Sequence, residues 1–499
     1  MEEKKIDINS IIGFILIFGI LVWIMYQNQP DPKVVAAEKA QKELVLKAQK
    51  AKELANKAVE KATVAVATGD STQLVALQKT LGNFAYSATL PSAKNDFTTI
   101  ENEVIKLKIA NKGGYIAEAT LKNFEKFKKG SGQLVELIKN NNANLNIVLQ
   151  TNDNRTLNTK DLFFEPTLTK IGADQVLSMK LKSGPNSFLE YKYIVKPNDY
   201  MIGFDVRSQG LNQVLNTAKP LDLEWDLKAF RNEKSISYEN KYTEIYFEHK
   251  EGKVDYAGLG AKEEETLEKP TFIAFKQHFF TSILVSKTPF EKAQLVSTNL
   301  MNDEKVDTTF TKSFKANLPL AFTNGELDYK LNWYLGPSDY KTLASYDQNL
   351  EKIITLGWGI IGWINRFIFV PLFGFLGSYI DYGIAIILFT ILIKLAMSPI
   401  TFKSFLSQAK MKVLRPEIAE LGEKFKKDPM KKQQETMKLY NKAGVNPMAG
   451  CIPALIQMPF LMASFQFFPS AFELRQQKFL WADDLSSFDE IVKLPFHIP

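Results

Sequence analysis

The stretch Gly383-Ile-Ala-Ile-Ile-Leu-Phe-Thr-Ile-Leu-Ile-Lys-Leu-Ala-Met397 decides how this sequence is organised, because a single lysine interrupts a long apolar run. At about 1.5 Å of rise per residue, Lys394 lies roughly 14 Å along a helix from the next cation, Lys403. A lysine at that depth of a bilayer costs roughly 2.5–3.5 kcal/mol. Each surrounding Ile, Leu or Phe contributes roughly 0.3–0.6 kcal/mol in favour of insertion. We therefore predict that 382–402 is a transmembrane helix carrying a charge.

A polar stripe runs along this predicted helix. Thr390, Lys394 and Ser398 are spaced by four residues and therefore share one helix face. Lipid disfavours such a face, so the stripe indicates a charge that faces a watery cavity. The alternative is a snorkelling lysine, whose stem follows the helix toward the headgroups.

Composition excludes several classes of site. The chain has 499 residues, one cysteine and three histidines, and its formal net charge is +7. A single Cys451 cannot form an intramolecular disulfide, and His249, His278 and His497 are too few for a multi-histidine metal site. No glycine-rich phosphate loop, CxxC pair or HExxH motif is present, so we expect neither a metal nor a cofactor.

Further segments are assigned by hydropathy and helix signals. Residues 1–29 are predicted to be an uncleaved transmembrane anchor and 30–70 an Ala/Lys/Glu-rich helical spacer. The segment 446–470 is a further predicted transmembrane helix, with Asn446 as its N-cap and Pro447 as its first residue.

Between these helices the period of the hydrophobic pattern changes to two. The predicted strands are separated by turn signals such as Ser183-Gly-Pro-Asn186, and they are Val104–Ile109, Tyr115–Leu121, Leu145–Gln150, Val176–Lys182, Phe188–Val195 and Tyr200–Val206. Many short strands at this spacing predict a large all-β sandwich over 71–350.

Charge predicts the topology. The segment Lys403–Lys442 contains eleven Lys or Arg and five Asp or Glu, so we place the predicted hairpin 403–445 in the cytoplasm. Its helices are expected over Ser404–Lys427 and from Pro429 to Lys442. The N-terminus is then cytoplasmic and the β domain periplasmic, and 351–381 is predicted to be an interfacial amphipathic helix. The basic surface is either simply solvated or a docking surface formed by Lys410, Lys412, Arg415, Lys431 and Lys432.

Several motifs together resemble the YidC-type membrane protein insertases of Gram-negative bacteria. They are Gly383–Pro399, Ala409-Lys-Met411, Met437-Lys-Leu-Tyr440, Val445-Asn-Pro447, Gly450-Cys-Ile-Pro453, Leu455-Ile-Gln-Met-Pro459 and Glu473-Leu-Arg-Gln476. The resemblance implies a multi-pass inner-membrane insertase and chaperone that needs no cofactor. It also implies a hydrophilic groove in which Lys394 attracts polar segments of an arriving chain, with Thr390, Ser398 and Gln457 lining it. The implied partners are nascent membrane proteins, the Sec translocon, the ribosome and membrane lipids, with no DNA.

The chain departs from the family pattern in two ways. The usual cation is arginine, and Lys394 lacks the planar fork that binds carboxylates through two hydrogen bonds. Family members of this type have five core helices, whereas this sequence ends at Pro499 in a periplasmic segment, 471–499, after two of them. Two explanations are open at this point: either the sequence is truncated, or this copy of the protein is incomplete.

Two other functions fit parts of the sequence. Large β-sandwiches include sugar-binding and sugar-converting enzymes, which makes a membrane-anchored carbohydrate-active protein the main alternative. The pairs of histidines or carboxylates that such chemistry uses are not evident in the sequence, so we predict no enzyme activity. A transporter or channel subunit that uses Lys394 as a substrate or proton site is the other possibility, although no inverted repeat is visible.

Overall fold

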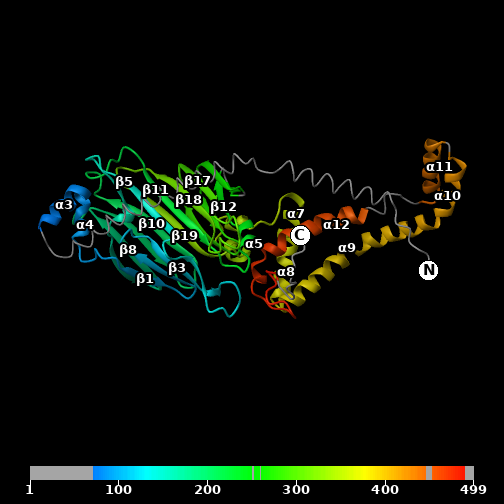
Figure 1. Cartoon of the computed structure of the whole chain (residues 1–499), viewed down its shortest axis with the longest axis horizontal. Coiled ribbons are helices and arrows are strands. Elements are labelled where there is room, and N and C mark those ends of the chain that lie inside the picture. Colours follow the sequence, from blue (N-terminus) through cyan, green and yellow to red (C-terminus); the bar gives the residue numbers. More distant parts are fainter. Residues whose placement is uncertain (1–70, 250–251, 259, 427, 445–451, 489–499) are drawn as a thin grey trace. The chain divides into compact units, whose positions relative to one another are not determined.

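A computed structural model of the chain describes residues 71–249, 252–258, 260–426, 428–444 and 452–488 (Figure 1). The predicted N-terminal anchor and spacer, and the predicted helix start at Asn446 and Pro447, lie outside these residues. The short helices α3 (Ser71–Leu81) and α4 (Ala85–Ala88) precede the first strand.

Three antiparallel sheets make up the β domain, as the period-two pattern predicted. The four-stranded sheet has the order β1-β2-β3-β4, the nine-stranded sheet β13-β12-β15-β16-β19-β10-β9-β8-β7, and the six-stranded sheet β14-β17-β18-β11-β5-β6. Their bounds are β1 Phe97–Glu101, β2 Ile105–Ala110, β3 Ile116–Glu125, β4 Leu134–Ile138, β5 Ala143–Gln150, β6 Thr156–Asn158, β7 Glu165–Ile171, β8 Asp174–Lys182, β9 Phe188–Val195, β10 Met201–Gln209, β11 Leu221–Phe230, β12 Glu244–His249, β13 Lys253–Ala257, β14 Lys262–Glu268, β15 Phe272–Lys276, β16 Phe280–Ser286, β17 Lys292–Asn299, β18 Phe310–Leu320 and β19 Asp328–Pro337.

The two larger sheets pack face to face through aromatic side chains. Trp225 of β11 stacks on Phe275 of β15 with ring centroids 3.8 Å apart, and it meets Trp333 of β19 edge-on at 5.3 Å. Along β11 buried residues alternate with more exposed ones, as expected of a strand with one face on the core. The sandwich is therefore held by the inward-facing residues of both sheets.

Strands β15 and β16 depart from this alternation, because every residue in both is buried. Phe275 and Leu284 face the sandwich core, whereas Phe272 and Ile283 belong to a second apolar cluster with the helices that follow the sheets. The uninterrupted apolar character of these strands thus reflects cover on both faces. One covering layer is the partner sheet, and the other consists of helices.

The helical part begins with α5 (Ile236–Lys241) and α6 (Tyr340–Ala344) at the sheets, and its longer elements follow β19. They are α7 (Gly359–Ile364), a π-helical turn η5 (Asn365–Phe369), α8 (Val370–Gly377), α9 (Tyr382–Val413), α10 (Arg415–Lys424), α11 (Pro429–Lys442) and α12 (Ile452–Ser470). Two described helical segments, 359–377 and α9, are long and apolar enough to cross a membrane. Length and composition alone do not distinguish a spanning 359–377 from the interfacial helix predicted there.

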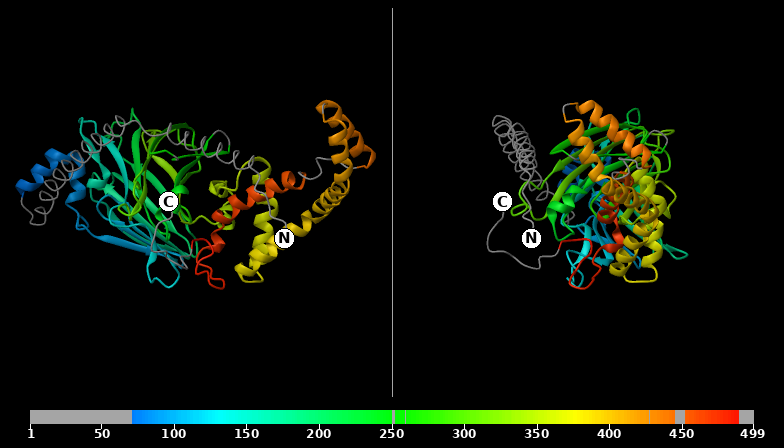
Figure 2. Two further views of the ribbon diagram at one scale, coloured as in Figure 1. Left: turned by 45° about the vertical axis from the view of Figure 1, so that its right-hand side comes forward. Right: turned by 90° about the vertical axis from the view of Figure 1, so that its right-hand side faces the viewer.

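Helix α9 corrects the predicted first helix of the hairpin. It continues past residue 402 to Val413, and Figure 2 shows it running unbroken to the hairpin, so the predicted helix Ser404–Lys427 is divided between α9 and α10. A charge such as Lys403 does not interrupt backbone hydrogen bonds, whereas Pro416 lacks the N–H that would continue them. Pro416 is tolerated because it lies in the first turn of α10. The predicted start of α11 is confirmed, since the Asp428 side chain accepts a hydrogen bond from the Lys431 backbone N–H.

Candidate functional site

Helices α8, α9 and α12 meet in a layer of phenylalanines. Phe369 and Phe389 meet edge-on at 4.8 Å, and Phe373 and Phe467 do so at 5.4 Å. Ala385 of α9 is fully buried against this cluster, which lets the helices approach closely. The layer fixes the first turns of α9 against the second half of α12.

The predicted polar stripe lies beyond this layer and on another face of α9. Thr390, Lys394 and Ser398 are all exposed. At about 100° per residue, Lys394 lies roughly half a turn around the helix from Ala385, so the stripe points away from the packed face. Among the described residues, none forms a hydrogen bond or ion pair with the Lys394 ammonium. The Thr390 hydroxyl donates to the Ile386 carbonyl oxygen at 2.8 Å, which satisfies it within the helix.

The structure does not join Gln457 to this stripe. Gln457 lies in α12 and is half-buried, and within the described part of the chain its amide makes no hydrogen bond to Lys394. The shared groove lining that the family resemblance implies for Gln457 therefore stays a prediction.

The end of α9 and the hairpin α10–α11 present their cations to solvent. The side chains of Lys410, Lys412, Arg415, Lys431 and Lys432 are exposed, and none of them forms an ion pair in the described part of the chain. Packing inside the hairpin is slight, since neither α10 nor α11 has a buried residue among those described. Its charges are thus available to an external anion.

The segment that follows α12 is joined to the β domain by a buried polar network that the sequence reasoning missed. Arg475 donates to the Glu233 carboxylate at 2.8 Å and to the Glu125 carbonyl oxygen at 2.7 Å. The Glu239 carboxylate accepts the backbone N–H of Asn232 and of Glu233. Burial, followed by the nearby charge of Glu233, raises the pKa of Glu239 to about 8. An arginine and two glutamates share this buried junction, and only its Arg475 lies in a motif that the family resemblance had singled out.

The two described histidines serve packing. His278 Nε2–H donates to the Pro469 carbonyl oxygen at 2.7 Å, and its ring stacks on Phe279 at 3.8 Å. Burial lowers the pKa of His278 to about 3, so the ring is neutral near pH 7. His249 meets Phe247 edge-on. Neither histidine is hydrogen-bonded to a carboxylate in the described part of the chain.

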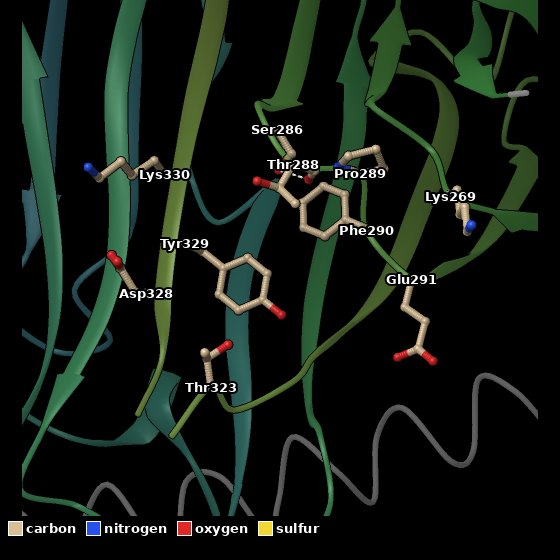
Figure 3. Close-up of a pocket in the computed structure, with 10 residues that line it drawn as sticks. All are labelled: Lys269, Ser286, Thr288, Pro289, Phe290, Glu291, Thr323, Asp328, Tyr329 and Lys330. Atoms are coloured by element: carbon tan, nitrogen blue, oxygen red, sulfur yellow. Dashed lines mark hydrogen bonds between the residues drawn. The ribbon is translucent and has the colours of Figure 1, made fainter. Parts of the chain in front are cut away.

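A cleft of about 520 Å³ opens at the edge of the β domain (Figure 3). Its lining residues are Lys269, Ser286, Thr288, Pro289, Phe290, Glu291, Thr323, Asp328, Tyr329 and Lys330. The rings of Phe290 and Tyr329 lie nearly parallel with centroids 6.4 Å apart. In Figure 3 the charged ends of Asp328 and Lys330 point away from these rings. The charges of the cleft do not converge on one point, as the acid–base pair of a sugar-converting enzyme would.

Comparisons with known proteins agree with this architecture. A model of the YidC periplasmic domain matches residues 98–371, and a model of the 60Kd inner membrane protein matches residues 373–498. The membrane protein insertase YidC of Parabacteroides distasonis is 35% identical over 512 residues, covering 99% of this chain and 79% of the relative. That of Bacteroides fragilis is 35% identical over 514 residues, covering 99% and 78%.

A solved structure of an active YidC insertase aligns with 80% of this chain and 77% of its own, at 16% identity and a TM-score of 0.29. The two family models together match residues 98–371 and 373–498, and the two relatives align with 99% of this chain. These matches identify the family without the solved structure. This chain belongs to the YidC family of membrane protein insertases.

Proposed function

We propose that this chain inserts and folds nascent membrane proteins at the bacterial inner membrane, and that the polar stripe of α9 receives their hydrophilic segments. One observation carries the proposal. Lys394 is exposed on the face of α9 opposite Ala385, and it has no partner among the described residues. If Lys394 had a structural role in an ion pair, its ammonium would lie beside a carboxylate. The YidC family consists of insertases and not of enzymes. The alternative function, a membrane-anchored carbohydrate-active protein, is therefore not favoured.

The stripe lowers the cost of bringing a polar segment into the membrane. A hydrophilic segment in hydrocarbon leaves its hydrogen-bonding groups unsatisfied, at several kcal/mol for each group. Ser398 offers a hydroxyl that has no hydrogen bond among the described residues, and Lys394 offers a positive charge. An acidic side chain about 4 Å from that charge gains about 4 kcal/mol at an effective dielectric constant of 20, against about 1 kcal/mol in water. Acidic segments should therefore benefit most.

The segment 359–377 is proposed to lie along the outer membrane surface rather than to span. Four residues before its start, the Thr355 hydroxyl is 2.9 Å from the Tyr246 hydroxyl of β12. Near its end, the Lys341 ammonium of α6 lies against Gly374. A spanning segment of this length would place its ends on opposite sides of a core about 30 Å thick. Here both ends contact residues attached to the β domain.

The exposed cations at the end of α9 and in the hairpin support a docking role on the cytoplasmic side. Lys410, Lys412 and Lys432 are free of ion pairs in the described chain, so an anionic surface could bind them without breaking internal contacts. Each such cation near an anionic surface is worth about 1 kcal/mol. We propose ribosomal RNA or anionic lipid as the anion, and the Sec translocon as a further partner.

Substitution at Lys394 tests the proposed function. Lys394→Arg should preserve insertion of a reporter with an acidic translocated tail, whereas Lys394→Ala and Lys394→Glu should impair it. The measurement is protease protection of the tail in cells depleted of the native insertase. Lys403→Ala is the matched control, because it removes an exposed lysine from the same helix.

The abundance of each variant separates function from folding. Removing a charge from the membrane removes a cost of a few kcal/mol, so Lys394→Ala should accumulate normally. Full insertion of the acidic reporter by Lys394→Ala at normal abundance would show that the charge does not receive substrate.

A further inference from the structure

The described tryptophans fall into two groups. Trp225 and Trp333 lie in the β domain and are 1% and 2% exposed, whereas Trp358 is 86%, Trp363 55% and Trp481 74% exposed. Tryptophan is enriched where a protein meets the headgroup region of a bilayer. The exposed group lies next to α7 and in the segment after α12, outside the sheets. The proposed role of the Lys394 stripe does not explain why Trp481 is exposed in the segment after α12.

Trp481 forms, with Leu480, the tip of a tight hairpin. Phe479 N–H donates to the Ala482 carbonyl oxygen at 3.0 Å, and Ala482 N–H donates back to Phe479 at 2.9 Å. Leu480 is 75% exposed and has a φ of 51°. A bulky side chain is disfavoured in this left-handed region, where glycine or asparagine would be relaxed. The hairpin holds two large apolar side chains outward at a conformational cost.

The base of this hairpin is fixed to the start of α9. A Cβ added at Gly383 would come within 2.0 Å of the Phe479 ring, so the ring fills the space beside the first turn of α9. Two more exposed rings precede α9: Phe375 in the last turn of α8 and Tyr379 in the turn that follows it, with centroids 5.1 Å apart. Exposed aromatic side chains thus gather where the apolar part of α9 begins.

We propose that the tip formed by Leu480 and Trp481 embeds in the outer-leaflet interface, with phospholipid as its partner. Because Phe479 is packed on Gly383, the embedded tip sets how deep α9, and with it Lys394, sits in the bilayer. The inference rests on the proposed function only in that α9 crosses the membrane. It assigns the hairpin Phe479–Ala482 the role of a depth anchor.

Lipid contact is measured directly by quenching with brominated phosphatidylcholine. The full chain is reconstituted in vesicles with bromine near the headgroup or near the bilayer centre, and its fluorescence is compared with that of Trp481→Phe. The signal lost in Trp481→Phe should be quenched more by the shallow bromine. As a control, Val306→Trp in the Trp481→Phe background adds a tryptophan at a β-domain position that is also 74% exposed. It should not be quenched.

Cysteine labelling identifies what covers the tip. In a Cys451→Ser background, Leu480→Cys in vesicles should react with an impermeant maleimide about tenfold more slowly than Val306→Cys, since burial of a large apolar side chain shifts such an equilibrium by a factor of that order. Equal rates would overturn the proposal. Slow labelling without quenching of Trp481 would show that protein covers the tip, and would also overturn it.

Two variants separate anchoring from folding. Leu480→Gly relieves the positive φ and should leave the hairpin intact, yet it should weaken the shallow quenching of Trp481. Trp481→Tyr keeps an interfacial side chain and should preserve slow labelling at Leu480→Cys. Resistance to carbonate extraction confirms that each variant is still in the membrane. If Trp481 is not quenched and Leu480→Cys is labelled rapidly while the protein still resists carbonate extraction, the depth anchor is refuted. The proposed role of Lys394 is unaffected by that result.

Discussion

Glu233 and Arg475 are 242 positions apart in the sequence, yet the Arg475 Nε–H donates to Glu233 Oε1 over 2.8 Å, with side-chain exposures of 9% and 3%. The guanidinium also lies over the Phe280 ring, 4.8 Å from its centroid. This pair attaches the segment after α12 to the β domain. The C-terminal end of α12 is therefore positioned by a domain that precedes it in the chain.

Breaking this pair should destabilise the protein strongly. Arg475→Met leaves the Glu233 carboxylate buried without its partner, which should cost about 3–5 kcal/mol of unfolding free energy. The measurement is the denaturant midpoint of the full chain in detergent. The double variant Arg475→Met with Glu233→Gln should lose less than the sum of the two single changes. Additive losses would contradict a direct interaction.

Glu239 should make stability fall as the pH rises. The folded chain holds the Glu239 proton up to about pH 8, whereas an unfolded glutamate releases it near its ordinary value of 4.5. The unfolding free energy therefore declines across that interval. Between about pH 6.5 and pH 8, Glu239→Gln should flatten the decline of the denaturant midpoint. An unchanged slope would mean that Glu239 is ionised in the folded protein.

His278 should act in the opposite direction at lower pH. Its pKa is lowered from 6.5 to about 3 by burial, so unfolding takes up a proton and stability is lost as the pH falls below about 6.5. His278→Gln keeps a donor for the Pro469 carbonyl oxygen and should reduce this loss. His249→Gln is the control: it replaces the other described histidine, and the loss of stability below about pH 6.5 should remain. Equal slopes for both variants would refute the assignment.

Topology can be read from single cysteines in a Cys451→Ser background. An impermeant maleimide should label Asn212→Cys from the periplasm and Lys431→Cys from the cytoplasm, because the cations of the hairpin favour the cytoplasmic side. Labelling of both sites from one side would reverse the proposed orientation.

The segment 359–377 has its own test in the same background. If it lies in the interface, Trp358→Cys and Ser378→Cys should both be labelled from the periplasm, because they flank it at its two ends. Labelling from opposite sides would instead show that the segment spans.

Sequence patterns predicted those features that depend on neighbouring residues. The predicted strand Phe188–Val195 is β9 itself, and Val176–Lys182 lies within β8, because alternation records one buried face. The end of α9 was placed too early because the prediction treated Lys403 as a boundary. The Arg475 junction was missed because its partners are distant in sequence and local patterns do not encode such pairings. The helix face on which Lys394 lies was predictable from spacing. That its ammonium has no partner in the described part of the chain could be learned only from the coordinates.

The unbroken helix α9 has a mechanical consequence. Its 32 residues extend about 48 Å, which exceeds a hydrocarbon core of about 30 Å. It is therefore a stiff rod, which in the proposed topology extends into the cytoplasm and carries the hairpin α10–α11 at its far end. A sideways force on the hairpin acts through a long lever arm on the segment around Lys394. Pro399 lacks a backbone N–H five residues beyond that lysine and is a point of compliance in the rod. A load on the hairpin would thus bend α9 beside Lys394, the charge proposed to receive the substrate.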